Sequence, residues 1–211
     1  MIEKENLLTD TFGREHTYLR ISLIERCNLR CTYCMPPEGV PLLPRDHLMT
    51  YEEIYTLAKL FVKHGVSKIR LTGGEPLIRK DIPTILEKLA TLPVTLSITT
   101  NAVVVDRHME TLKKYGVNKI NVSLDSLDRE KFRKITLRDD FEKVYTNLMA
   151  LIANDFEVKL NMVVMKGVND NEIVDFIELS KELPISVRFI RGHTSLTKRC
   201  SVRLGTGSIA G

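Results

Sequence analysis

Apolar and polar residues alternate in six short segments of the chain, and longer amphipathic segments separate them. The alternating segments are 17–24, 68–72, 95–100, 119–124, 158–164 and 185–190. Alternation with a period of two predicts β-strands with one apolar face and one polar face. Each connection between successive strands exceeds the dozen residues that a parallel crossover requires. We therefore expect an α/β fold with six β-α units, too few for an eight-unit barrel.

The connections carry helix signals. Two sets of apolar residues recur at helical spacing, and they are Ile54, Leu57, Ala58, Phe61 and Val62 in one segment and Ile82, Ile85, Leu86 and Leu89 in another. Thr50 and Glu53 have the spacing of a capping box at the start of the first helix. Gly65 and Gly116 lie where helices should end.

The polar face of the predicted sheet is rich in cations, which are Arg20, Lys68, Arg70, Lys159 and Arg188. Helices must cover the apolar face, so a curled sheet would place these cations in a wet lumen. Cations that converge in one cavity repel one another unless an anion binds there, and phosphate is the usual anion. An antiparallel sheet with one solvated face would give the same alternation. The long helical connections argue against that alternative.

Composition places the chain among ordinary globular proteins, with 211 residues, 43% hydrophobic and 27% charged. It contains no apolar run of about 18 residues, so we expect no membrane span. The charged start lacks the apolar core of a secretory signal, so we expect a cytoplasmic protein. Residues 191–211 contain four of the 31 basic residues and none of the 27 acidic ones, so residues 1–190 are balanced. We therefore expect no nucleic-acid partner.

Three of the four cysteines, Cys27, Cys31 and Cys34, form a C-x3-C-x2-C motif directly after the first predicted strand. Iron–sulfur clusters are held by cysteine thiolates, and three thiolates leave one iron of a four-iron cluster open to another ligand. The carboxyl ends of barrel strands are also where such folds carry their chemistry. A non-catalytic zinc module, with His47 as a fourth ligand, is the alternative.

The cysteine motif resembles the signature of the radical S-adenosylmethionine (SAM) superfamily. The segment 72–76, Thr-Gly-Gly-Glu-Pro, resembles the GGEP segment of that superfamily. The resemblance implies a partial (β/α)6 barrel of parallel strands and a [4Fe-4S] cluster whose open iron chelates SAM. It also implies an enzyme that cleaves SAM to a 5′-deoxyadenosyl radical, which abstracts a hydrogen atom from the substrate.

Further segments are similar to the GTP 3′,8-cyclase family of molybdenum cofactor biosynthesis. They are 10–14, 19–22, 34–36, 68–77, 99–101, 121–126, 166–170 and 187–190. This resemblance implies conversion of GTP to 3′,8-cyclo-7,8-dihydro-GTP, a reducing electron donor as partner, and a homodimer. A radical SAM enzyme that acts on another substrate, such as a peptide, is the alternative, although such an enzyme would not need a cationic lumen.

The resemblance assigns roles to individual residues. It implies that Cys27, Cys31 and Cys34 ligate the cluster. It implies that the residues near SAM are Tyr33, Gly74, Ser123 and Asn161. It implies that Arg20, Arg70, Thr99 and Lys159 hold GTP, with Lys68 and Arg188 nearby. Five of these six GTP residues, all except Thr99, are also the cations that the alternation places in the lumen.

The chain departs from the family after residue 190. Family members are longer and carry a second three-cysteine cluster. Residues 191–211 instead contain four glycines and no acid, a composition that predicts disorder. We therefore expect residues 1–190 to form the radical SAM core barrel and residues 191–211 to form an unstructured, divergent tail. The break suggests truncation or a change of reading frame, and we expect impaired cyclisation of GTP.

Overall fold

The computed structural model describes residues 8–34 and 47–192. Their strands form one sheet in the order β1-β2-β3-β4-β5-β6, and every neighbouring pair is parallel. The strands are β1 (Tyr18–Ser22), β2 (Lys68–Thr72), β3 (Thr95–Thr100), β4 (Lys119–Ser123), β5 (Glu157–Val164) and β6 (Ile185–Arg191). The predicted α/β fold with six parallel strands is confirmed, and the antiparallel alternative is wrong.

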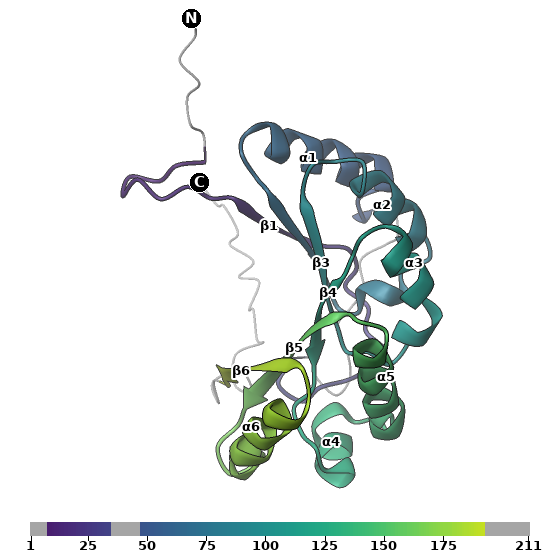
Figure 1. Ribbon diagram of the computed structural model, residues 1–211, viewed down its shortest axis with the longest axis vertical. Coiled ribbons are helices and arrows are strands. Elements are labelled where there is room, and N and C mark those ends of the chain that lie inside the picture. The colour runs from purple at the N-terminus through teal and green to yellow at the C-terminus, as the bar shows by residue number, and fades with distance from the viewer. Residues whose placement is uncertain (1–7, 35–46, 193–211) are drawn as a thin grey trace, which may run out of the picture.

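Helices line the outer, convex side of this curved sheet, and the concave side is open (Figure 1). The α-helices are α1 (Tyr51–Lys63), α2 (Ile82–Leu89), α3 (Met109–Lys114), α4 (Arg129–Thr136), α5 (Phe141–Ala153) and α6 (Ile173–Glu182). Short 3-10 helices are η2 (Pro76–Ile78), η3 (Val105–Arg107) and η4 (Asp170–Glu172). Because β1 and β6 lie at opposite ends of the strand order, the barrel is partial.

Local sequence signals begin and end these helices as expected. The Thr50 hydroxyl accepts from the Glu53 backbone N–H at 3.2 Å, and the Glu53 carboxylate accepts from the Thr50 N–H at 2.8 Å. This reciprocal pair is the predicted capping box of α1. Gly65 (φ +108°) and Gly116 (φ +71°) follow α1 and α3 in backbone conformations that L side chains rarely adopt.

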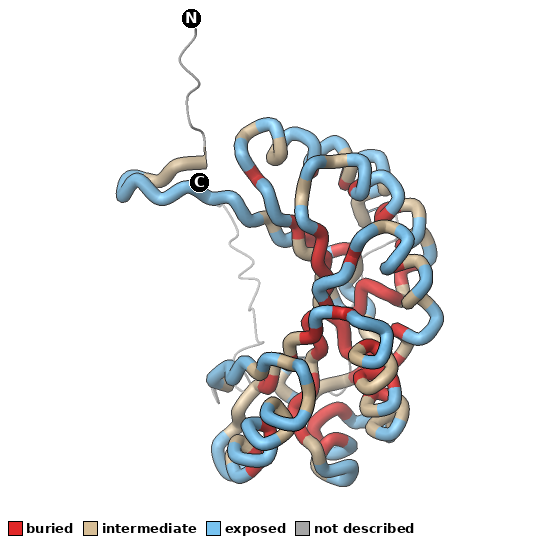
Figure 2. The backbone as a smooth tube through the Cα atoms, in the orientation of Figure 1, coloured by how far each residue is buried: buried red, intermediate tan, exposed pale blue. Residues whose placement is uncertain are grey.

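The core lies between the apolar face of the sheet and the helices, where buried positions are concentrated (Figure 2). All four apolar residues predicted for the face of α2 are buried. Leu57, an apolar position predicted for the face of α1, is exposed (41%), and so is Phe189, an apolar position of the alternating segment that forms β6 (38%). Both lie beside an edge strand of the open sheet, where no further strand covers them. A closed barrel would have buried them, and the sequence pattern does not reveal which edges stay open.

The polar face carries the chemistry in successive rows across the sheet. In the lower row Arg20 pairs in register with Arg70, and Arg70 with Ser97. In an upper row Ser123 pairs with Asn161, and Asn161 with Arg188. The predicted SAM residues and the predicted cations are therefore distributed from the carboxyl ends to the amino ends of the same strands, on one face.

At its carboxyl end β6 extends to Arg191, and the Gly192 N–H donates to the Val164 carbonyl at 2.9 Å. The rest of the predicted tail, residues 193–211, lies outside the described residues. Within the described part of the chain, no helix combines the length and the apolar character needed to cross a membrane.

Candidate functional site

A cavity of about 190 Å³ opens at the carboxyl ends of β1 to β4, and we call it the carboxyl-end cavity. Its lining contains all three cysteines of the motif together with polar side chains. The lining residues are Cys27, Leu29, Cys31, Tyr33, Cys34, Thr72, Gly73, Gly74, Thr99, Thr100, Asn101, Ser123, Asp125, Phe132 and Thr136. The structure therefore brings the cysteine motif and the GGEP segment together, as the sequence predicts.

Backbone hydrogen bonds to the end of α4 hold the cysteine loop in place. The N–H groups of Arg30 and Thr32 donate to the carbonyls of Thr136 and Ile135, each at 2.9 Å. The sulfur of Cys27 accepts from the Leu29 N–H at 3.4 Å. Residues far apart in sequence thus fix a loop whose thiols face one cavity.

Burial raises the pKa of Cys27 and raises the pKa of Cys31 to about 12. Both thiols are therefore protonated at neutral pH, and a metal group that binds them must displace protons. Among the described residues, no three His, Cys, Asp or Glu side chains converge closely enough to hold one metal ion. His47, the fourth ligand of the zinc alternative, is exposed and does not line this cavity.

The glycines of the GGEP segment allow its backbone to pack directly on the chain just before Cys27. The Gly74 N–H donates to the Ile24 carbonyl at 2.6 Å, and the Glu75 N–H donates to the Arg26 carbonyl at 2.8 Å. A Cβ atom at Gly74 would lie 2.2 Å from the Arg26 carbonyl oxygen. Only glycine fits this contact, so the close approach of the two segments depends on it.

Glu75 lies behind the cavity, fully buried, and connects β2 to the loop after β3. Its carboxylate accepts from the Thr100 hydroxyl (2.8 Å), the Asn101 N–H (2.7 Å) and the Leu77 N–H (3.0 Å). Burial raises the pKa of Glu75 to about 7. The Asn101 side chain in turn donates to the sulfur of Cys27 at 3.5 Å. Glu75 thus supports the cysteine loop through Asn101, a role that the sequence did not reveal.

Asp125 is a second buried acid, and it lines the cavity directly. The Tyr33 hydroxyl donates to one of its carboxylate oxygens at 2.7 Å, and the Val163 N–H donates to the other at 2.8 Å. Burial raises the pKa of both Tyr33 and Asp125. Asp125 therefore ties the cysteine loop to β5. No motif considered in the sequence singled it out for this role.

Three of the four predicted SAM residues, Tyr33, Gly74 and Ser123, line the carboxyl-end cavity. Asn161 is the register partner of Ser123, and its buried side-chain oxygen has no hydrogen-bond partner. A buried polar atom without a partner is costly, and a ligand donor at this place would satisfy it. This observation fits a polar ligand beside the cysteines.

A second cavity, of about 170 Å³, lies at the amino ends of the strands, and we call it the amino-end cavity. It is lined by Tyr18, Lys68, Arg70, Thr95, Ser97, Lys119, Asn121, Glu157 and Lys159. The structure therefore gathers three of the predicted lumen cations, Lys68, Arg70 and Lys159, in one place. Lys119 and Asn121, which the family resemblance did not assign, also belong to this lining.

The other three predicted substrate residues lie elsewhere. Thr99 lines the carboxyl-end cavity, and Arg20 lines a groove between β1 and α1. Arg188 is exposed on β6, in register with Asn161. The charges of Arg20 and Arg188 still act on Arg70, because together with burial they lower its pKa.

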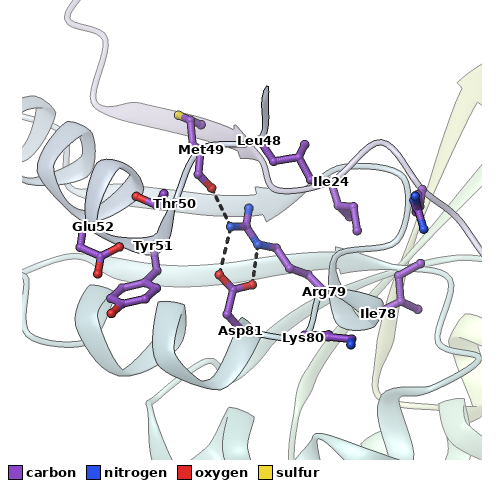
Figure 3. Close-up of a pocket in the computed structure, with 11 residues that line it drawn as sticks. Ile24, Leu48, Met49, Thr50, Tyr51, Glu52, Ile78, Arg79, Lys80 and Asp81 are labelled. Carbon is purple, nitrogen blue, oxygen red and sulfur yellow. Dashed lines mark hydrogen bonds and ion pairs between the residues drawn. The ribbon is translucent and has the colours of Figure 1, made fainter. Parts of the chain in front are cut away.

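A larger cavity, about 570 Å³, lies outside the cysteine loop, between the starts of α1 and α2 (Figure 3). Arg79, which is buried, donates to the Leu23 carbonyl and to the Met49 carbonyl, each at 2.6 Å. It also forms two hydrogen bonds to Asp81, at 2.7 and 3.0 Å. A single guanidinium thus holds both ends of the connection that carries the cysteines. No sequence pattern singled out this arginine.

The profile of the Radical SAM superfamily matches residues 21–180 of the chain. Among curated proteins, the chain is 54% identical over 183 residues to molybdenum cofactor biosynthesis protein moc-5 of Caenorhabditis elegans, covering 86% of this chain and 30% of that protein. It is 50% identical to the mitochondrial GTP 3′,8-cyclase of Arabidopsis thaliana, covering 88% of this chain and 48% of that protein. It is 46% identical to the GTP 3′,8-cyclase of Listeria monocytogenes, covering 87% of this chain and 56% of that protein. The chain thus spans about a third to a half of these relatives.

Solved structures show the same fold at low sequence identity. Streptococcus suis SuiB bound to S-adenosylmethionine superposes with a TM-score of 0.63 at 23% identity, over 83% of this chain and 38% of that one. Methylornithine synthase superposes with a TM-score of 0.64 at 18% identity, over 84% of this chain and 54% of that one. At these identities, the likeness concerns the fold alone.

Proposed function

Because the chain belongs to the radical SAM superfamily, we propose that Cys27, Cys31 and Cys34 hold one [4Fe-4S] cluster and that SAM binds the iron they leave open. The donor set fits, because three thiols face one cavity and no fourth cysteine lines it among the described residues. When bound, this pair supplies reductive cleavage of SAM and abstraction of a hydrogen atom from a substrate. An external electron donor would provide the reducing electron.

In this proposal, residues of the chain orient the amino-acid end of SAM. The exposed backbone beside Gly74 offers polar groups at close range, since that residue has no side chain. Ser123 and the unpartnered oxygen of Asn161 lie in the next row across the sheet. Tyr33, which Asp125 holds by the hydrogen bond described above, would lie against the bound SAM.

We propose that the substrate is GTP, and that the product is 3′,8-cyclo-7,8-dihydro-GTP, the first intermediate of molybdenum cofactor biosynthesis. The observation that carries this proposal is the presence of two cavities on one polar face, one with the cysteines and the other with Lys68, Arg70 and Lys159. Cations in the amino-end cavity would hold the triphosphate, with Arg20 and Arg188 adding to the positive field.

Thr99 connects the two cavities in this proposal. It lines the carboxyl-end cavity, while its register partner Asn121 lines the amino-end cavity. A nucleotide whose phosphates lie among the cations would pass Thr99 before its sugar reaches the SAM side. The relatives that carry the name GTP 3′,8-cyclase support this choice of substrate over a peptide.

We propose further that the protein acts in the cytoplasm and forms a homodimer, and that residues 1–190 form the core barrel. The relatives extend well beyond the matched region. The binding steps and the radical step are therefore tested separately from product formation.

Anaerobic reconstitution of the full chain with iron and sulfide tests the proposal. We expect a brown protein with about four irons per chain, and 5′-deoxyadenosine after addition of SAM and a reductant. Added GTP should bind. A colourless protein that takes up zinc and no iron would contradict the proposal and favour the zinc module.

A further inference from the structure

Asn121 is buried in the middle of β4, on the polar face of the sheet, and faces Arg70 from two strands away. With its side-chain oxygen turned toward Arg70, it accepts from Nη1 at 2.8 Å and from Nε and Nη2 at 3.2 Å. The opposite orientation would set the amide nitrogen against the guanidinium donors. The oxygen therefore points at Arg70, and the contact involves all three guanidinium nitrogens.

The other partners of Arg70 are neutral as well. Its Nε donates to the Ser97 hydroxyl at 3.4 Å, and its guanidinium carbon lies 5.2 Å from the centre of the Tyr18 ring. Within residues 8–34 and 47–192, no carboxylate forms an ion pair with Arg70. The acid of this cavity, Glu157, instead pairs with Lys119 at 3.2 Å and with Lys159 at 3.4 Å.

Arg70 thus combines a fixed position with an uncompensated charge. A carboxylate in place of the Asn121 amide would fix the guanidinium equally well but would neutralise it before any ligand arrived. A small side chain would leave the charge free but the group unsupported. A neutral oxygen acceptor avoids both problems. Because Arg20 and Arg188 also repel Arg70, a bound anion would relieve a repulsion that the fold maintains.

We propose that Asn121 is a positioning and specificity-determining residue, which holds Arg70 for the phosphates of the substrate and keeps its charge available to them. This inference rests on the proposed function, since it deepens the assignment of the amino-end cavity to a triphosphate. It concerns a residue that the family resemblance did not assign. The neutrality of the Asn121 side chain, as well as its hydrogen bonding, determines anion affinity.

Binding of inorganic tripolyphosphate to the full chain, measured by calorimetry, tests the inference without cluster or SAM. We expect Asn121→Asp to weaken binding by about ten- to a hundredfold, because the new carboxylate pairs with Arg70. Its unfolding temperature should stay at or above that of the wild type. Asn121→Ala should weaken binding by about three- to tenfold and lower the unfolding temperature, because the guanidinium loses an acceptor.

Asn118→Asp is the matched control, since it makes the same chemical change three residues earlier, at an exposed position outside the cavity. We expect its tripolyphosphate affinity to stay within about twofold of the wild type. Equal losses in Asn118→Asp and Asn121→Asp would overturn the inference, because net charge alone would then explain them. Wild-type affinity in Asn121→Asp would overturn it too. If Asn121→Asp does not fold, wild-type tripolyphosphate affinity in Asn121→Ala would overturn the inference.

Two further outcomes separate this inference from the proposed function. If the wild type binds no tripolyphosphate, the inference and the GTP site both fall. If the Asn121 variants behave as expected but the reconstituted chain forms no 5′-deoxyadenosine, the inference stands and the radical SAM proposal falls. SAM affinity in the reconstituted Asn121→Asp variant should match the wild type, a result that general damage to the barrel would not give.

Discussion

The two cavities on the polar face of the sheet are close to equal in volume but are built in opposite ways. The carboxyl-end cavity is lined by thiols, neutral groups and one acid, Asp125, and a second buried acid, Glu75, supports it from behind. The amino-end cavity is formed by strand residues and is lined by four cations and one acid, Glu157. A single parallel sheet thus offers a positive field at one end and a largely uncharged, preorganised pocket at the other.

This contrast shows where each cavity obtains its rigidity. Side chains on strands need little support, because the ladder of backbone hydrogen bonds fixes them. Loop residues lack that ladder, so the carboxyl-end cavity relies on hydrogen bonds from buried acids and on a glycine contact. We therefore expect substitutions in the loops to damage one cavity only, and substitutions on the strands to change charge with little loss of structure.

The largest expected effect comes from Cys31→Ala. Because three thiolates are the proposed protein ligands of the cluster, removal of one should reduce bound iron after reconstitution to near background. Tripolyphosphate affinity should stay within about twofold, since the amino-end cavity is formed by other elements. Cys200→Ala, which changes the cysteine outside the motif, is the control and should retain iron. Full iron content in Cys31→Ala would refute the cluster assignment.

Next in size is Gly74→Ala, which places a methyl group 2.2 Å from the Arg26 carbonyl oxygen and 2.5 Å from that of Glu25. Because backbone must move to make room, we expect a loss of about 3 kcal/mol in the free energy of unfolding and loss of SAM binding. Gly116→Ala provides the comparison, since it meets no atom within 4 Å and only its φ of +71° is strained.

Gly116→Ala should lower the free energy of unfolding by about 1 kcal/mol and leave SAM binding intact. Urea denaturation and SAM titration of the reconstituted proteins measure both effects. Equal costs at Gly74 and Gly116 would show that conformation alone, and not the contact with Arg26, requires glycine in the GGEP segment.

A smaller effect is expected from Lys68→Met in the amino-end cavity. Lys68 is exposed, so the loss of its charge should weaken tripolyphosphate binding by only about fivefold, or about 1 kcal/mol. Iron content should not change. Lys59→Met removes an exposed lysine from α1, outside both cavities, and should leave both quantities unaltered. A change in iron content with Lys68→Met would mean that the two cavities are not independent.

The smallest effect concerns pH. Burial raises the pKa of Glu75 from 4.5 to about 7, so the folded state resists its ionisation. The contribution of Glu75 to the free energy of unfolding is therefore fully present below pH 4.5 and is lost as pH rises through about 7. Glu75→Gln cannot ionise, so its free energy of unfolding should decline less than that of the wild type between pH 5 and pH 8.

Urea denaturation at several pH values gives the comparison. Glu87→Gln, an exposed change on α2, should keep the wild-type dependence. A Glu75→Gln variant with an unaltered pH dependence would show that Glu75 is already ionised across this range, held by its three hydrogen-bond donors.

Much of this fold is predictable from the sequence, because alternation and capping are local. Five of the six strands match the predicted segments to within one residue, and two of them, 68–72 and 95–100, match residue for residue. The cysteine motif and the GGEP segment are also local signals, and the fold brings them together because the carboxyl ends of parallel strands share one edge. Their assigned contacts with SAM and GTP stay predictions.

The rest depends on packing between distant segments. Nothing local in the sequence shows that Glu75, Arg79, Asp125 and Asn121 are each buried against particular hydrogen-bond partners from distant segments. The positions of Arg20 and Arg188 outside the amino-end cavity also escape prediction, because alternation assigns a face but not a height or a tilt. Exposure of Leu57 follows from an open edge, which only the assembled sheet reveals.

Arg79 has one more consequence, which concerns the entropy of the cysteine-bearing connection. Because its guanidinium holds the carbonyls of Leu23 and Met49, the two ends of that connection are brought together when the barrel folds. Figure 3 shows the hydrogen bond to Met49. The entropy of closing the loop is then lost during folding and not again when a metal group arrives. An excised peptide with the same three cysteines, lacking this closure, should assemble a cluster much less readily than the intact chain.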